Sequence, residues 1–222
     1  MPSEAHKSFD ANLKDIERLL ELHTMVGGTT KGRRYGLEVL NKSAIALITA
    51  YWEGYCEDVA AEALAHIVKH AKSSDVLPNE LKKQLAKELK DAPHELEVWK
   101  IADRRWKKYL GDRLERLKEK RNWDFNTPKT EQINKLFLQA VGIKQISSCW
   151  KWPKKMTVNR AAHKLDKYVA LRGAIAHRGK GSVTVKKAQV EDYFDFINRL
   201  ATETGGAVNS HVNGITGRPL WS

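Results

Sequence analysis

The stretch from Leu37 to about Ala71 contains no proline and no other effective helix breaker. Apolar residues recur along it at steps of three and four, the spacing of a helix that packs against a core. These residues are Leu40, Ala44, Leu47, Ile48, Tyr51, Tyr55, Val59 and Ala63. The sequence therefore predicts one long core helix.

The rest of the chain is also predicted to be helical. Apolar spacing, prolines and capping residues indicate helices at about 4–25, 79–90, 94–121, 130–141, 157–178 and 186–204. Pro78 and Pro93 suit first helical turns, and the two helices that they open form a helical insertion over about 78–122. Only residues 182–185 alternate like a strand, too little for a sheet. The fold class is therefore all-α, most simply an antiparallel helical bundle with an additional helical insertion.

The length of 222 residues suffices for one substantial core without help from metals or disulfides. We expect a single helical domain over 1–204 and a weakly ordered C-terminal tail over 205–222, which is rich in Gly and Asn. Cys56 and Cys149 lie far apart in sequence and form neither a disulfide framework nor a metal-binding pair. No signal peptide or membrane-spanning run is present, so the sequence predicts a cytoplasmic protein with no membrane partner.

Positive charge is concentrated in one part of the chain. The whole protein carries a formal charge of +12. Between Val141 and Lys187 twelve Lys and Arg residues stand against a single acidic residue, Asp166, a net charge of +11. Clustered Lys and Arg gain from counterion release when they neutralise phosphates, which favours a polyanionic partner and points to RNA.

Within this basic segment, Arg172 and His177 form an R-x4-H motif. Position 172 falls on the apolar face of the predicted helix, where a hydrophobic side chain is usual. The charged Arg172 therefore needs a carboxylate, a partner subunit or a groove that holds an anion. A structural ion pair with Glu53 or Glu57 is one alternative. His177 lies roughly 140° further round an ideal helix. The two side chains therefore converge only if Gly173 permits a distortion or a second copy completes the site.

Four segments of the chain together form a recognisable pattern: the motif at 171–177, Ala50-Tyr51-Trp52-Glu53-Gly54-Tyr55-Cys56-Glu57-Asp58, Asp124-Phe125-Asn126-Thr127-Pro128 and Ser147-Ser148-Cys149-Trp150-Lys151-Trp152. These segments resemble the HEPN superfamily and its RiboL-PSP-HEPN branch. The resemblance spans about 44–200. It implies a HEPN-type bundle that forms a homodimer, with two R-x4-H motifs facing one cleft, and a metal-independent endoribonuclease in active members. Such proteins resemble toxins and antiviral effectors, so a cognate antitoxin is a possible partner.

The same resemblance assigns roles to single residues. Arg172 would bind the scissile phosphate and His177 would relay a proton. Glu53 and Glu57 would orient Arg172 or be structural. The cations that flank the motif are expected to contact the RNA backbone: Lys154, Lys155, Arg178 and Lys180. No metal and no cofactor are expected, because His66 and His70 have metal-pair spacing but no third ligand near them in sequence.

One departure from the family pattern keeps alternatives open. The family commonly places a polar residue directly after the motif arginine, whereas this chain has Gly173. A non-catalytic RNA- or nucleotide-binding module is therefore one alternative. Another is a helical interaction protein whose basic face docks an acidic partner such as an antitoxin. Trp99, Trp106 and Trp123, which accompany many cations, either stack on RNA or anchor a charged helix on the core.

Overall fold

The computed structural model describes residues 3–27, 36–102, 105–124, 127–153, 156–178 and 183–221, with the side chains of 97, 117–124, 177 and 178 left out. Within these ranges the regular elements are all helical, which confirms the all-α fold class. The α-helices are α1 (Glu4–Gly27), α2 (Glu38–His70), α3 (Asn79–Lys90), α4 (Trp106–Asp124), α5 (Thr130–Val141), α6 (Val158–Arg178) and α7 (Lys187–Thr216). Short 3-10 helices are η1 (Ser74–Val76), η2 (Glu95–Ile101) and η3 (Ile146–Cys149).

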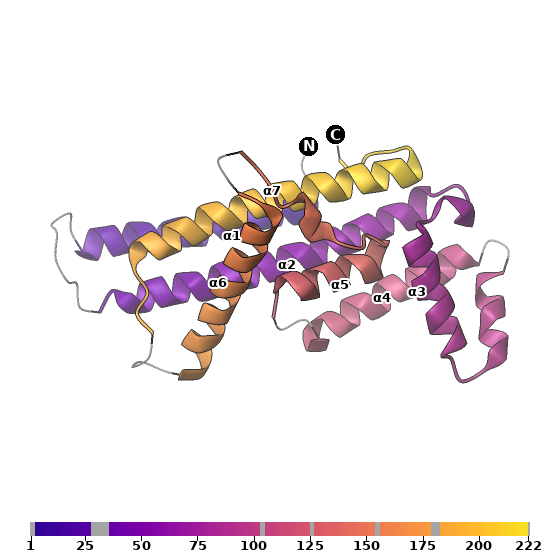
Figure 1. Ribbon diagram of the computed structural model, residues 1–222, viewed down its shortest axis with the longest axis horizontal. Coiled ribbons are helices and arrows are strands. Elements are labelled where there is room, and N and C mark those ends of the chain that lie inside the picture. The colour runs from indigo at the N-terminus through magenta and orange to yellow at the C-terminus, as the bar shows by residue number, and fades with distance from the viewer. Residues whose placement is uncertain are drawn as a thin grey trace.

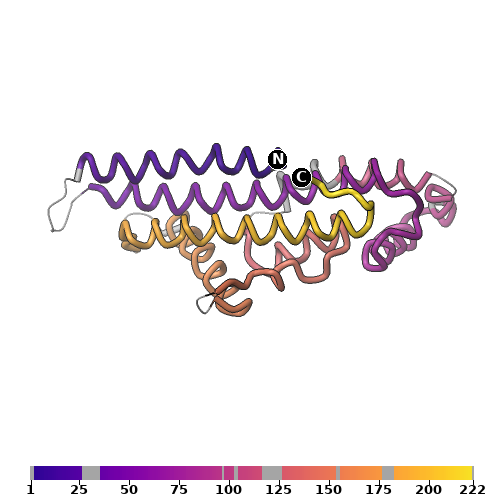
Figure 2. Tube along the Cα trace, turned by 90° about the horizontal axis from the view of Figure 1, so that it is seen from above, coloured from indigo at the N-terminus to yellow at the C-terminus, as the bar shows by residue number. Residues whose placement is uncertain are grey.

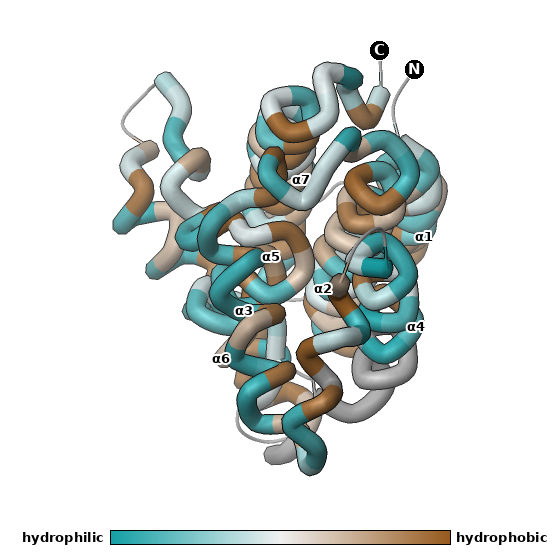
Figure 3. Tube along the Cα trace, turned by 90° about the vertical axis from the view of Figure 1, so that its right-hand side faces the viewer, coloured by the Kyte–Doolittle hydropathy of each residue, from teal (hydrophilic) through white to brown (hydrophobic). Residues whose placement is uncertain are grey.

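Helix α2 is the predicted core helix and runs through the middle of the molecule (Figure 1). Helices α1, α4, α5, α6 and α7 all pack against it. Its buried side chains, such as Ile48, Trp52, Tyr55 and Val59, are too numerous for a single narrow stripe. A helix that is apolar on several sides is stable only inside a bundle. Figure 2 shows α2 between α1 and α7, and Figure 3 shows hydrophilic residues on the outward sides of α1 and α4.

Polar contacts set the directions of the long helices. The amide of Ala5 donates to Glu62 at 2.7 Å and the Tyr51 hydroxyl donates to Asp15 at 2.9 Å, so α1 runs antiparallel to α2. Three contacts join α2 to α7 in parallel register: Asn41 Nδ2 to the Val185 carbonyl at 2.9 Å, Thr49 Oγ1 with Tyr193 Oη at 3.1 Å, and Tyr55 Oη to the Ala201 carbonyl at 2.8 Å. Helix α7 therefore runs parallel to α2, whereas neighbouring helices of a simple up-and-down bundle run antiparallel to each other.

Buried aromatic rings fix the segment that precedes α6. The rings of Trp52 on α2 and Trp150 after η3 meet edge to face, with centroids 6.2 Å apart. Trp150 Nε1 donates to Thr204 Oγ1 on α7 at 2.9 Å. Both tryptophans are fully buried. The chain therefore enters α6 from a point anchored on α2 and α7.

The helical insertion is present, but one of its predicted helices is interrupted. In place of one helix over 94–121 the chain forms η2 and then α4, because Ala102 is extended. Of the apolar side chains of η2, Leu96, Val98 and Trp99 are exposed and only Ile101 packs against the core, so η2 lacks the buried stripe that would hold an α-helix in place. Trp106 is buried on the core instead.

The predicted weakly ordered tail is wrong for residues 205–216, because α7 continues to Thr216 and ends at Gly217 with φ +69°. Val208 and Val212 are fully buried and extend the apolar stripe of the helix. Gly205 lies against α2, where an added Cβ would come within 2.6 Å of Tyr55 Oη. This glycine permits a close approach between helices and does not break the helix.

Candidate functional site

Helix α6 carries the R-x4-H motif and crosses α2 obliquely, with its C-terminal end away from the long helices (Figure 1). The amide of Arg160 donates to Thr157 Oγ at 3.3 Å, which caps the start of the helix where the sequence predicted it. Tyr168 stacks on Tyr193 with ring centroids 4.0 Å apart, and its hydroxyl donates to Asp192 at 2.7 Å. These contacts fix the middle of α6 on α7, one turn before Arg172.

Arg172 is half-buried and lies on the side of α6 that faces the carboxylates of α2. Its positive charge lowers the pKa of Glu53, so the two groups interact through space. Among the described residues, no carboxylate lies within ion-pair distance of the Arg172 guanidinium. The ion pair between Arg172 and Glu53 or Glu57, which the sequence analysis gave as one alternative, is therefore not formed among the described residues.

Glu53 and Glu57 stand one turn apart on α2, and both are half-buried. The pKa of Glu53 is raised to about 7, chiefly by burial and then by the neighbouring carboxylate of Glu57, with Arg172 opposing both. Burial penalises the charged form of a carboxyl group. Glu53 consequently changes charge near neutral pH, beside the motif arginine. The structure thus brings together Glu53, Glu57 and Arg172.

The backbone of α6 is continuous through His177, whose side chain lies outside the described residues. Gly173 lies within an uninterrupted helix, and an added Cβ there would meet no atom within 4 Å. The distortion that Gly173 was expected to permit is therefore not seen. Positions 172 and 177 remain roughly 140° apart around the helix, so one copy of α6 directs them to different sides.

The cations chosen as RNA contacts fall outside the described structure. Lys154, Lys155 and Lys180 are not described, and of Arg178 only the helical backbone is. Their roles stay predictions. Arg160 and Lys167 are exposed on α6; the sequence analysis included them in the net charge between Val141 and Lys187 but gave them no separate role.

No metal centre emerges from the described residues. The rings of His66 and His70 have centroids 4.4 Å apart, but no group of three potential ligands occurs in this part of the chain. Burial lowers the pKa of both histidines; the neighbouring His70 lowers the pKa of His66 further, and the positive charge of Arg218 lowers that of His70. Likewise, none of the described helices is long and apolar enough to cross a membrane.

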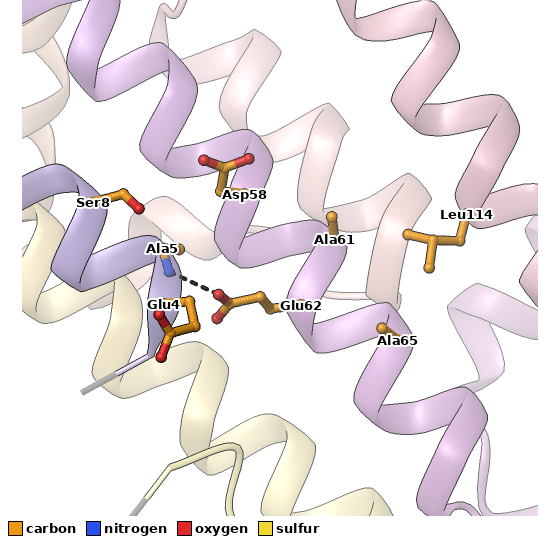
Figure 4. A pocket seen from close by; sticks show the side chains of 8 residues that line it. All are labelled: Glu4, Ala5, Ser8, Asp58, Ala61, Glu62, Ala65 and Leu114. Carbon is orange, nitrogen blue, oxygen red and sulfur yellow. Dashed lines mark hydrogen bonds between the residues drawn. The ribbon is translucent and has the colours of Figure 1, made fainter. Parts of the chain in front are cut away.

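A cavity of about 320 Å³ lies apart from the motif, between α1, α2 and α4 (Figure 4). Glu4, Asp58 and Glu62 line it, and Glu62 accepts a hydrogen bond from the Ala5 amide. Carboxylates repel phosphate groups. This cavity is therefore not a candidate site for a nucleic acid.

Comparison with known proteins gives one match. The family model described as RiboL-PSP-HEPN matches residues 10–210, which confirms the resemblance found in the sequence and extends it to most of α1 and α7. No curated protein and no solved structure matches.

Proposed function

This chain belongs to the RiboL-PSP-HEPN family, and from that premise we propose that it is a metal-independent endoribonuclease that uses Arg172 and His177. HEPN domains are often ribonucleases. The observation that carries the proposal is the state of Arg172. The Arg172 side chain is half-buried and interacts electrostatically with Glu53, yet no described carboxylate lies within ion-pair distance of its guanidinium, which leaves its donors for a phosphate.

The chemistry follows from the two side chains. Arg172 holds the scissile phosphate and offsets the negative charge that develops on its oxygens. The ribose 2′-hydroxyl attacks phosphorus and loses its proton, the bond to the 5′-oxygen breaks, and that oxygen gains a proton. His177 takes part as the group that accepts or delivers this proton. The products are a 2′,3′-cyclic phosphate and a 5′-hydroxyl.

Two copies of the chain complete the site. Because positions 172 and 177 face different sides of one α6, a cleft between two copies supplies the pair that one copy separates. Near the C-terminal end of α6, Leu171 and Ile175 pack against the core with one part of each side chain and are half-buried, so the remaining exposed part suits such a contact. Glu53 and Glu57 orient Arg172 from α2. A toxin or phage-defence role, with an antitoxin as partner, belongs to the same proposal.

The test is incubation of the wild-type chain, His177→Ala and Arg172→Ala with mixed RNA in EDTA, followed by analysis of fragment ends. We expect cyclic-phosphate ends from the wild type and a rate at least about 100-fold lower in each variant. An equal rate in His177→Ala would contradict the assignment.

Gly173 favours a second candidate function. It stands where the family commonly has a polar residue, and the space beside it is open. A non-catalytic module would bind RNA or nucleotides with strong salt dependence and release no product. A helical interaction protein would bind an acidic partner such as an antitoxin and show no RNA affinity beyond that of any basic protein.

A further inference from the structure

A second cavity, here termed the α2-end cavity, lies near the C-terminal end of α2. Its volume is about 510 Å³, and the start of α1, the last turns of α2 and the segment after α7 line it. The start of α1 and the segment after α7 lie side by side (Figure 1, Figure 2). His66 in this cavity stands about 20 Å along the axis of α2 from Glu53, at 1.5 Å per residue. The α2-end cavity is therefore separate from the candidate site around Arg172.

Hydrogen bonds hold the segment after α7 in place as one wall of the cavity. The amides of Leu220 and Trp221 donate to Asn209 Oδ1 on α7 at 2.7 and 3.3 Å. The amide of Arg218 donates to Thr216 Oγ1 at 3.1 Å. Contacts within the protein thus fix this wall on α7.

Basic groups gather at the C-terminal end of α2. Lys69 and His70 stand in the last turn of this helix and line the cavity. The pKa of His70 is lowered by desolvation and then by the positive charges of Arg218, Lys69 and Lys107, which come from three segments. No carboxylate of the described ranges lies within ion-pair distance of Lys69, Lys107 or Arg218. The positive charge of this cluster is therefore not neutralised by these ranges, which suits an anion.

The two histidines of the cavity, His66 and His70, suit the same kind of ligand. Their ring centroids are 4.4 Å apart. Nε2 of His66 is buried and has no hydrogen-bond partner within the described part of the chain. A buried polar atom without a partner is costly, so a ligand oxygen at this nitrogen would stabilise the site. Desolvation and then His70 lower the pKa of His66, whereas an anion beside both rings favours their charged forms.

The carboxylates that line the cavity have partners within the protein. Glu62 accepts a hydrogen bond from the Ala5 amide at 2.7 Å, and Glu4 pairs with Lys7 at 2.5 Å. Glu62 stands two turns before His70, about 12 Å along the axis of α2. The end of the cavity at His70 therefore stays positive.

We propose that the α2-end cavity binds a phosphate monoester that carries an aromatic ring. Lys69 and Arg218 neutralise the phosphate, His66 donates a hydrogen bond to it from Nε2, and the ring lies against the indole of Trp221. A phosphate monoester carries close to two negative charges at neutral pH, which suits this cluster better than a singly charged phosphodiester. Such a group occurs in phosphorylated small molecules and at the 5′-phosphorylated end of an RNA.

The experiment titrates the full-length chain with phenyl phosphate and with benzenesulfonate, which has the same ring and one negative charge. Lys69→Gln/Arg218→Gln removes two cations of the site. Lys87→Gln/Lys90→Gln removes two exposed cations from α3, which does not line the cavity. Helical content and the melting temperature of both variants are measured first, and calorimetry then gives the affinities.

We expect the wild type to bind phenyl phosphate at least about 10-fold more tightly than benzenesulfonate, because hydrogen bonds to charged groups are the strong ones. Lys69→Gln/Arg218→Gln should weaken phenyl phosphate binding at least about 10-fold, and the α3 variant at most about twofold. Equal affinity of the wild type for the two probes, no binding of phenyl phosphate, or equal losses in the two variants would overturn the proposal.

A second readout follows the histidines themselves. Proton NMR of the ring resonances over a pH series gives the pKa of His66 and of His70. Phenyl phosphate should raise both values, because a bound dianion offsets the positive charges beside the rings. Unchanged values in the presence of bound phenyl phosphate would place the ligand elsewhere and contradict the site.

Two RNAs that differ only in a 5′-phosphate or a 5′-hydroxyl distinguish the two sources of the ligand, in a chain with His177→Ala. Tighter binding of the phosphorylated RNA, lost in Lys69→Gln/Arg218→Gln, assigns the site to an RNA end. Equal binding of the two RNAs beside tight binding of phenyl phosphate assigns it to a small molecule. Neither result depends on RNA cleavage, so the ribonuclease proposal stands or fails separately.

Discussion

At the scale of single residues, the carboxyl group of Glu53 stands between a like charge and an opposite one. Burial and Glu57 raise its pKa to about 7, and Arg172 opposes them. An ordinary glutamate is fully ionised at that pH. In the folded protein Glu53 therefore holds a proton over a pH range in which the unfolded chain has lost it.

This difference predicts a pH-dependent stability. Between about pH 4.5 and 7 the folded state binds more protons at Glu53, so the free energy of unfolding falls as the pH rises through this window. Glu53→Gln should remove the penalty and stabilise the protein by about 1 kcal/mol at pH 8, after allowance for solvent screening, with little change at pH 4. Urea unfolding at pH 4 and pH 8 measures the free energy of unfolding of the wild type and the variant, with Glu17→Gln on α1 as the exposed control. A variant less stable than wild type at pH 8 would show that Glu53 is needed as a charged partner.

The residues of the candidate site were predictable to different degrees. Arg172, Glu53 and Glu57 were selected from the sequence by resemblance, and the structure places them together. Their electrostatic coupling was not predictable, because it depends on where α6 crosses α2 and on how deeply Glu53 is buried. The rotation between positions 172 and 177 was predictable from helix geometry alone.

At the scale of elements, α7 shows that glycines in a sequence do not always mark the end of a helix. Gly205, Gly206 and Gly214 lower intrinsic helix propensity and suggested a tail after 204. Burial of Val208 and Val212 overrides that preference. The periodic helices α1, α2, α5 and α6 were predicted within a few residues, since their stripes and capping residues are local signals. The break between η2 and α4 has no comparable local signal.

Two neighbouring glycines of α7 provide a matched test of this packing. In Gly205→Ala the new Cβ would overlap Tyr55 Oη and displace the hydrogen bond from Tyr55 to the Ala201 carbonyl. We expect a loss of about 1–3 kcal/mol in the free energy of unfolding. Gly206→Ala adds the same atom where nothing lies within 4 Å, and should stabilise the helix by about 0.4–1 kcal/mol. Chemical denaturation distinguishes the two, and equal effects would mean that α7 does not approach α2 closely at Gly205.

At the scale of the whole molecule, the proposed active site needs two copies of the chain. The bundle holds the middle of α6 on α7 through Tyr168 and leaves the C-terminal end of α6 away from the long helices (Figure 1). Helix geometry separates the two motif positions within each copy. HEPN domains often dimerise, and the proposed cleft between two copies brings position 172 of one copy to position 177 of the other.

Mixing inactive variants tests this assembly. Arg172→Ala and His177→Ala chains are each expected to be inactive, whereas a co-refolded mixture should recover RNA cleavage, because a mixed dimer contains one intact arginine and one intact histidine in the same cleft. Sedimentation at the assay concentration shows whether dimers are present. A mixture as inactive as its parts, with dimers observed, would rule out a shared site.

The parallel pairing of α2 with α7 has a consequence for synthesis on the ribosome. Thr49 and Tyr193 meet across 144 residues of sequence. At ordinary translation rates, roughly 7 to 30 s separate the synthesis of these two residues. Over that interval the apolar side of α2 destined for α7 has no partner in the nascent chain, which makes the unfinished protein a natural client for chaperones that shield exposed hydrophobic segments.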